Sequence, residues 1–371
     1  MDQEIKIGIL TIHQSVNFGA TLQAFATNRF LRKNDLPAEI ANYRLPSSEP
    51  NSHLNTNIKA TWKNDKNWAP LHRLKLALSL TLQYPSKALR YRRFDAFRAK
   101  HMQISTPCFT AQALSLLGYT HYICGSDQIW NQPYHSRLNT IFFGEIPGEH
   151  KTIAYAASMG NTIYSDKNLA LASTLINRMT ACGVREQDMC DYFQPHVKIP
   201  VTQVLDPTFL LEREDYESVM SQKTAKRPYV LLYLVQNSQE AISIAQRIAD
   251  KLHCELIEIR SSKEHGVKHR QVYDIGPAEF LRYFADTEYV VTNSFHGTAF
   301  ALLFEKQLTV IDNKKRGSRI SNLLRNAGLS DRMVETYEQI DETPIDYEKV
   351  HRLLEPERER SRRFLLDALE K

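Results

Sequence analysis

Short apolar runs that end at a polar turn and continue into a helical segment recur along this chain, and they restrict its fold more than any other feature. Residues 5–12 form such a run, a polar turn follows at 14–19, and apolar residues then recur at helical spacing from Ala20 to Phe30. The pattern returns at 289–304. Units of this kind build parallel sheets covered by helices, and ligands bind beyond the carboxyl ends of such strands. The sequence therefore predicts an α/β protein.

Two groups of these units are separated by a polar segment at 212–227. The strands that we expect lie at 5–12, 121–124, 152–156 and 183–185 in the first group, and at 229–235, 255–259 and 289–292 in the second, where a turn up to His296 follows the last strand. This predicts an N-terminal α/β domain over 1–212, a C-terminal α/β domain over 213–345, and a charged C-terminal helix over 346–371. We expect the two domains to face a central cleft, and the last helix has the N-terminal domain as one surface on which to pack.

Composition excludes several classes of protein. The chain has 371 residues, of which 42% are hydrophobic and 24% charged, as in globular proteins. A net charge of +5 is too small to indicate nucleic-acid binding. The N-terminal residues are unlike a signal peptide, no apolar run reaches the length of a membrane span, and the five cysteines are scattered without a Cys-x-x-Cys pair. These features predict a cytoplasmic protein with reduced thiols.

The turn at 294–297 places His296 at the start of a helix, one residue before Gly297. Free backbone N–H groups and the positive end of the helix dipole lie at such a position. This arrangement suits an anionic substrate that must also be protonated.

Four segments together resemble the polysaccharide pyruvyl transferase family. They are residues 17–24, 125–131, 184–188 with 205–209, and 292–298, in the family's order within residues 5 to 330. The resemblance implies two Rossmann-like domains similar to those of GT-B glycosyltransferases. It also implies transfer of a pyruvyl group from phosphoenolpyruvate to two hydroxyls of a sugar, which gives a cyclic ketal.

Ketal formation from an enol phosphate requires a proton donor, an anion site and a group that binds sugar hydroxyls, and it formally requires neither a metal nor a cofactor. We predict that His296 is the general acid, against the alternative of a structural histidine. Arg185 is the predicted anion clamp, against an ion pair with Glu186 or Asp188. Asp127 is the predicted partner of an acceptor hydroxyl, although aspartate is also common in turns.

Further candidates for substrate binding surround these three residues. Asn293, Ser294 and Gly297 offer donors at the helix start, although plain helix capping is compatible with the same residues. Several family members carry arginine at the position of Ser294, and the nearest downstream candidates to replace it are Arg316 and Arg319. The remaining candidates are Asn17 and Gly19 at the first helix, and Ser126 and Gln128 beside Asp127. Trp130 either stacks on a sugar or belongs to the core.

A basic, leucine-rich stretch extends from Lys59 to Lys100, with Trp62 and Trp68 near its start. One interpretation is a surface for anionic lipid headgroups at the inner membrane, and the other is an ordinary solvated helix pair.

The resemblance and the candidate residues together give the lead hypothesis, which is a pyruvyl transferase of capsule or exopolysaccharide assembly, with a sugar or lipid-linked oligosaccharide as acceptor. The alternatives are a metal-independent GT-B glycosyltransferase with a nucleotide-sugar donor, and a non-catalytic glycan-binding protein. The absence of an Asp-x-Asp pair disfavours a metal-dependent transferase.

Overall fold

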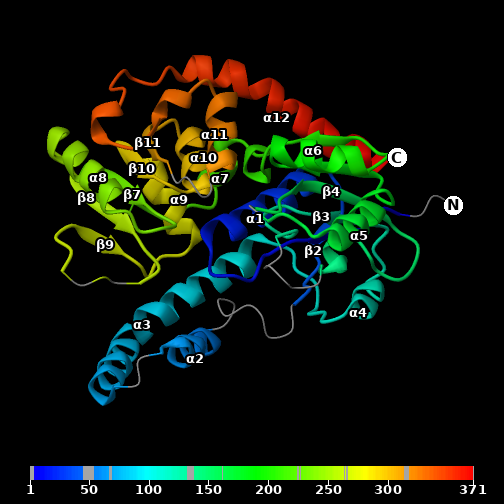
Figure 1. Cartoon of the computed structure of the whole chain (residues 1–371), viewed down its shortest axis with the longest axis horizontal. Coiled ribbons are helices and arrows are strands. Elements are labelled where there is room, and N and C mark those ends of the chain that lie inside the picture. The colour runs from blue at the N-terminus through cyan, green and yellow to red at the C-terminus, as the bar shows by residue number, and fades with distance from the viewer. Residues whose placement is uncertain are drawn as a thin grey trace.

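A computed structural model of the chain describes residues 4–44, 54–66, 69–131, 138–160, 162–223, 225, 227–262, 264, 266–312 and 317–370. Trp68 and Arg316 lie outside the described residues. Figure 1 shows two lobes side by side, with an N-terminal lobe in blue to green and a C-terminal lobe in yellow to orange. Each lobe contains one sheet, and a pair of helices extends away from both lobes (Figure 1).

The N-terminal sheet has six parallel strands in the order β2-β1-β3-β4-β5-β6. They are β1 (Ile7–Leu10), β2 (Ala38–Ile40), β3 (His121–Cys124), β4 (Lys151–Ala157), β5 (Ala181–Val184) and β6 (Val201–Gln203). The helices of this part are α1 (Phe18–Lys33), α2 (Leu54–Asn64), α3 (Pro70–His101), α4 (Ala111–Ser115), α5 (Asp166–Ile176) and α6 (Gln187–Phe193).

The C-terminal sheet has six parallel strands in the order β12-β11-β10-β7-β8-β9. They are β7 (Tyr229–Tyr233), β8 (Glu255–Ile259), β9 (Arg270–Val272), β10 (Tyr289–Thr292), β11 (Gln307–Ile311) and β12 (Met333–Val334). The helices are α7 (Arg213–Glu217), α8 (Gln239–Lys251), α9 (Pro277–Asp286), α10 (Phe295–Leu303), α11 (Gly317–Asn326) and α12 (Tyr347–Glu370). The predicted α/β class with two parallel sheets is confirmed.

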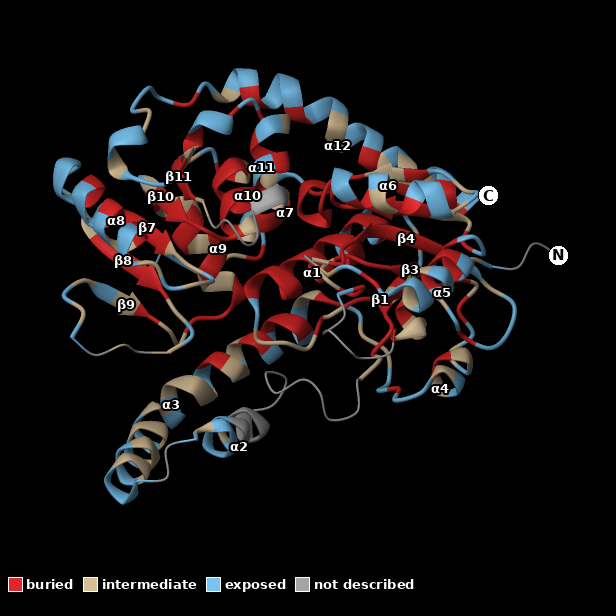
Figure 2. Ribbon diagram, in the orientation of Figure 1, coloured by how far each residue is buried: buried red, intermediate tan, exposed pale blue. Residues whose placement is uncertain are grey.

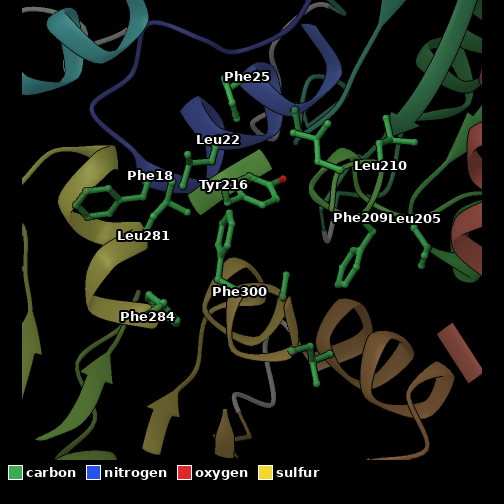
Figure 3. Packing of buried hydrophobic residues seen from close by; sticks show 14 of the residues in the cluster. Phe18, Leu22, Phe25, Leu205, Phe209, Leu210, Tyr216, Leu281, Phe284 and Phe300 are labelled. Atoms are coloured by element: carbon green, nitrogen blue, oxygen red, sulfur yellow. The ribbon is translucent and has the colours of Figure 1, made fainter. Parts of the chain in front are cut away.

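Helix α1 is packed on nearly every side because it lies where the two lobes meet. Thirteen of its sixteen residues are buried, and the exposed ones, Arg29, Arg32 and Lys33, lie toward its C-terminal end. Phe18 at its N-terminal end stacks on Phe280 of α9 with ring centroids 4.3 Å apart. Figure 3 shows Phe18, Leu22 and Phe25 facing side chains of the C-terminal lobe within one hydrophobic cluster. This shared core fixes the N-terminal end of α1 against the C-terminal lobe.

Helix α12 lies along both lobes, as the red helix of Figure 1 shows. Near its start, the Tyr347 hydroxyl lies 3.4 Å from the carbonyl oxygen of Ala301, to which it donates. Further along, the Ser361 hydroxyl oxygen accepts from the Leu205 N–H at 2.9 Å, and Leu365 is fully buried. The helix therefore holds the lobes together on the side opposite the projecting helices.

Every helix in the described part of the chain is too short or too polar to cross a lipid bilayer.

Candidate functional site

A cleft opens between the lobes, at the carboxyl ends of strands from both sheets. Its N-terminal wall comes from the segments that follow β1 and β3, and its C-terminal wall from those that follow β7 and β10, together with α11. The lining residues are Asn17, Asp127, Gln128, Val235, Gln236, Asn293, Ser294, Phe295, His296, Arg319 and Ile320. Parallel α/β sheets bind ligands at this edge.

His296 occupies the first turn of α10, directly after β10. Ser294 is the N-cap of this helix, and its hydroxyl oxygen accepts from the Gly297 N–H at 3.2 Å. The Thr292 hydroxyl accepts from the Ser294 N–H at 3.0 Å. The capping role of Ser294 is thus visible, and the turn holds His296 at a positive helix end.

The ring of His296 also lies against the N-terminal end of α1, directly beside Gly19. A Cβ atom on Gly19 would lie 2.1 Å from the His296 Nδ1 atom, so only glycine allows this approach. Asn17 is the N-cap of α1, and its Oδ1 atom accepts from the Ala20 N–H at 3.2 Å. Two helix N-termini therefore meet at one histidine, and both favour a bound anion.

Behind the histidine lies a buried carboxylate that the sequence did not single out as a site residue. The Asp206 Oδ2 atom is 3.8 Å from the His296 Nε2 atom, and the Asp206 side chain is fully buried. The Asp206 Oδ1 atom accepts from the Thr208 N–H at 3.0 Å. Asp206 follows β6 in the N-terminal lobe, so the contact with His296 crosses the cleft.

Arg185 lies beside Asp206 in a buried layer behind His296, and not in the wall of the cleft. Its Nη1 atom donates to Asp206 Oδ2 at 2.8 Å, and its Nε atom donates to Glu186 Oε1 at 3.1 Å. The Arg185 side chain is only 2% exposed. The ion pair with Glu186, which was the alternative, is therefore present, and the role of Arg185 as an anion clamp stays a prediction.

The burial of this layer sets the charge states of the unliganded site. Burial lowers the pKa of His296 below its ordinary value, and the carboxylates of Asp206 and Asp127 oppose this shift without overcoming it. Burial alone would raise the pKa of Asp206, but His296, Arg185 and the Thr208 N–H together hold it below its ordinary value. Before an anion binds, the site thus pairs an ionised Asp206 with a histidine that is neutral at neutral pH.

The substitution Asp206→Asn is expected to lower the free energy of unfolding by about 3 kcal/mol, because it leaves part of the buried Arg185 charge uncompensated. The urea unfolding midpoint measures this. The matched control is Glu217→Gln, which breaks the half-exposed pair with Arg213 and should cost about 0.5 kcal/mol or less. Equal midpoints for Asp206→Asn and the wild type would contradict the structural role of this pair.

The three site candidates in the turn after β3, which are Ser126, Asp127 and Gln128, take different positions. Ser126 is fully buried, and its hydroxyl donates to the Ala156 carbonyl at 2.8 Å, so it lies behind the cleft. Its N–H donates to the Oε1 atom of Gln23, which holds this turn against α1. Asp127, with a φ of 67°, and Gln128 both line the cleft. Asp127 therefore faces the cleft, and Ser126 does not.

The remaining candidates divide between the cleft and the protein interior. Asn293 ties the segment after β7 to the site, since its Oδ1 atom accepts from the Val235 N–H at 2.9 Å and its Nδ2 atom donates to the Gln236 carbonyl at 2.8 Å. Arg319 of α11 lines the cleft. Trp130 is fully buried and stacks on Phe143 with centroids 4.6 Å apart, so it belongs to the core.

Within the described residues, no group of three or more histidine, cysteine, aspartate or glutamate side chains is arranged to hold a metal ion.

Comparisons with known proteins identify a family and a fold. The family model described as polysaccharide pyruvyl transferase matches residues 17–315, which include the whole lining of the cleft before α11. A search of curated protein sequences found no match.

Solved structures of similar fold are distant in sequence. UDP-GlcNAc 2-epimerase from Neisseria meningitidis, bound to UDP-GlcNAc, is similar over 99% of this chain and 99% of that chain, at 10% identity and a TM-score of 0.53. S. aureus MnaA in a structure with UDP is similar over 95% and 91%, at 8% identity and a TM-score of 0.49. E. coli ADP-heptose LPS heptosyltransferase II is similar over 96% and 99%, at 13% identity and a TM-score of 0.38. The first of these likenesses supports the GT-B-like fold and nothing further.

Proposed function

Because the chain belongs to the polysaccharide pyruvyl transferase family, we propose that it transfers the pyruvyl group of phosphoenolpyruvate to two hydroxyls of one sugar. The product would be a cyclic ketal in a bacterial surface polysaccharide, such as a capsule or exopolysaccharide, or in its lipid-linked precursor. The observation that carries this proposal is His296 held between two helix N-termini, with the ionised Asp206 behind it.

The electrostatics of the cleft support the binding of the donor's two anionic groups. The N-terminal ends of α1 and α10 and the guanidinium of Arg319 favour negative charge in the same cleft. A carboxylate and a phosphate bound here would raise the proton affinity of His296, which is lowered in the empty site. Donor binding would therefore convert the neutral histidine to the imidazolium that the reaction requires.

The chemistry follows from these positions. The imidazolium of His296 would protonate the methylene carbon of the donor, and positive charge would develop on the neighbouring carbon. One sugar hydroxyl attacks that carbon, with Asp127 binding the hydroxyl and accepting its proton. The second hydroxyl attacks as the bond from carbon to the phosphate oxygen breaks. Two protons are released from the sugar hydroxyls. One of them reprotonates His296, which gave its own proton to the methylene carbon, and the other leaves with inorganic phosphate.

Phosphoenolpyruvate binding at neutral pH is expected to take up protons, up to about one per site, because the pKa of His296 starts below its ordinary value and rises beside bound anions. Calorimetric titration in two buffers of different ionisation enthalpy measures this uptake. His296→Gln should reduce the uptake, since the donor's own titration is common to both proteins. The same uptake in the variant would show that His296 does not change its protonation.

A nucleotide-sugar donor is the second candidate, favoured by the similar fold of an epimerase bound to UDP-GlcNAc and by serine at position 294. The two candidates differ in the ligand that stabilises the protein. Thermal stabilisation by phosphoenolpyruvate, and none by UDP, is expected for the pyruvyl transferase. Stabilisation by UDP alone would favour the glycosyltransferase, and a protein that binds acceptor without consuming either donor would be a non-catalytic member.

We propose further that the protein works in the cytoplasm, in peripheral contact with the inner membrane surface, since a lipid-linked acceptor would be anchored there. The reaction as written uses no metal and no cofactor.

A further inference from the structure

Helices α2 and α3 form an arm that extends from the body of the protein (Figure 1). Helix α3 has 32 residues, which corresponds to about 48 Å. Its buried residues all lie in the C-terminal half: Arg90, Phe94, Phe97 and Arg98. The outer part of α3 is drawn in tan and pale blue in Figure 2, because its residues are intermediate or exposed. Most of this long helix is therefore not held by the core of either lobe.

One face of α3 is a stripe of exposed leucines. Leu71, Leu74, Leu78, Leu82 and Leu89 follow one another at intervals of three, four, four and seven residues, which places them on one side of the helix. The first four are between 58% and 70% exposed. Of the fourteen large apolar side chains that are exposed in the described part of the chain, seven lie between residues 62 and 89. This concentration marks an interaction surface.

Helix α2 packs on another side of α3 and leaves the stripe uncovered. The Nη1 atom of Arg73 donates to the Trp62 carbonyl at 2.8 Å, and its Nη2 atom donates to the Asp65 carbonyl at 3.0 Å. The Arg73 guanidinium lies 4.9 Å from the centre of the Trp62 ring. These contacts join the two helices into one unit, so that the basic side chains of α2 are held on the same arm as the leucines of α3.

The charge of the arm is nearly all positive. Between residues 58 and 92 the only acidic residue is Asp65, and its carboxylate pairs with His72 at 2.8 Å. Exposed basic side chains on the same segment are Lys59, Lys63, Lys66, Lys75 and Arg92. Two copies of such a surface would repel each other, whereas an anionic bilayer would neutralise the lysines and receive the leucines. Charge complementarity therefore selects a lipid surface over a second copy of the chain.

The base of the arm is bonded to both lobes beside the cleft. The Arg90 Nη1 atom donates to the Arg260 carbonyl at 2.9 Å, and its guanidinium lies 4.6 Å from the centre of the Phe18 ring. The Arg93 Nη1 atom donates to the Asp274 carbonyl at 3.0 Å. The arm is thus fixed relative to the cleft, and any surface that its outer leucines bind would have a defined orientation relative to the cleft.

We propose that the leucine face of α3, with the lysines of α2, docks this protein on an anionic lipid bilayer. The leucines enter the boundary between headgroups and acyl chains, and the lysines bind lipid phosphates. The purpose of docking, which is access to a membrane-anchored acceptor, rests on the proposed function. The docking itself requires neither donor nor acceptor.

The test is co-sedimentation of the full chain with vesicles of phosphatidylcholine alone or of phosphatidylcholine mixed with phosphatidylglycerol. Wild type is expected to bind the mixed vesicles about tenfold more tightly than the neutral ones, and less tightly as salt rises. The double variant Leu74→Ser with Leu78→Ser should lose about tenfold in binding. The double variant Lys63→Glu with Lys75→Glu should lose the preference for phosphatidylglycerol.

Matched controls separate the arm from surface composition in general. Leu116→Ser with Ile163→Ser changes two side chains that are 79% and 77% exposed elsewhere, and should leave binding unchanged. Lys167→Glu with Lys198→Glu changes two exposed lysines outside the arm, and should leave the preference for phosphatidylglycerol unchanged. Equal losses in the controls, or no binding of wild type to mixed vesicles, would overturn the proposal. A dimer in solution that Leu74→Ser with Leu78→Ser dissociates would replace the lipid by a second copy.

Failure of docking and failure of the proposed reaction give different results. Vesicle binding is measured without substrates, so it stands or falls without reference to pyruvyl transfer. Conversely, the leucine variant should release phosphate from phosphoenolpyruvate at the wild-type rate with a water-soluble acceptor, since the stripe lies outside the cleft.

Discussion

His296→Ala is expected to lower the rate of phosphate release from phosphoenolpyruvate by about 1,000-fold, because the variant lacks the group that protonates the methylene carbon. The fold should persist, since the side chain is not part of the hydrophobic clusters that join the lobes. The measurement is acceptor-dependent phosphate release at saturating donor, together with the thermal unfolding midpoint. His296→Gln tests the same loss with a side chain of closer size.

Donor binding and turnover in His296→Ala distinguish a proton donor from a binding group. Removing the ring leaves both helix N-termini in place, so phosphoenolpyruvate should still bind and kcat should fall more than affinity. Near wild-type turnover in His296→Ala would remove this residue from the mechanism. A variant that binds no donor at all would make His296 a binding group and leave the proton source to be found.

Gly19→Ala is the second variant with a large expected effect, and it leaves every reacting group chemically unchanged. The added methyl group would lie 2.1 Å from the His296 Nδ1 atom, so the ring must move. A displacement of about 1 Å in a reacting group costs on the order of 100-fold in rate. Alanine is otherwise well suited to a helix, so the activation free energy should change by more than the free energy of unfolding does.

A double-variant cycle isolates this contact. If Gly19 acts only through His296, then adding Gly19→Ala to His296→Ala should change turnover no further. A full additional loss in the double variant would show that Gly19 has another role, such as close approach of its backbone to the donor. Unchanged turnover in Gly19→Ala alone would contradict the packing of the ring against α1.

The sequence predicts those parts of the structure that depend on local patterns. The strand and turn before α10 follow from an apolar run and a capping serine, and the parallel sheets follow from repeated units of this kind. The edge strands β2, β6, β9 and β12 were not predicted, because two or three residues are too few to show a period, and the five-residue strand β11 was also missed. The burial of α1 on nearly every side also carries no local signal, since it results from the meeting of two lobes.

The arrangement of the site depends on contacts between distant parts of the chain. Gly19 reads as a turn residue until His296 is seen beside it, and Asp206 reads as a break before Pro207 until its carboxylate is seen behind the same ring. Arg185 was predicted to bind substrate because a guanidinium suits anions. Its side chain is instead buried with Glu186 and Asp206, and no local pattern distinguishes an arginine that pairs internally from one that faces a ligand.

The measurement that tests the central claim most directly is release of inorganic phosphate from phosphoenolpyruvate with a panel of hexosides and lipid-linked sugars, with the product examined by NMR. We predict release that requires an acceptor, a ketal carbon joined to two sugar oxygens in the product, and loss of both signals in His296→Ala. Hydrolysis of a nucleotide sugar by the wild type, with no binding of phosphoenolpyruvate, would contradict the account.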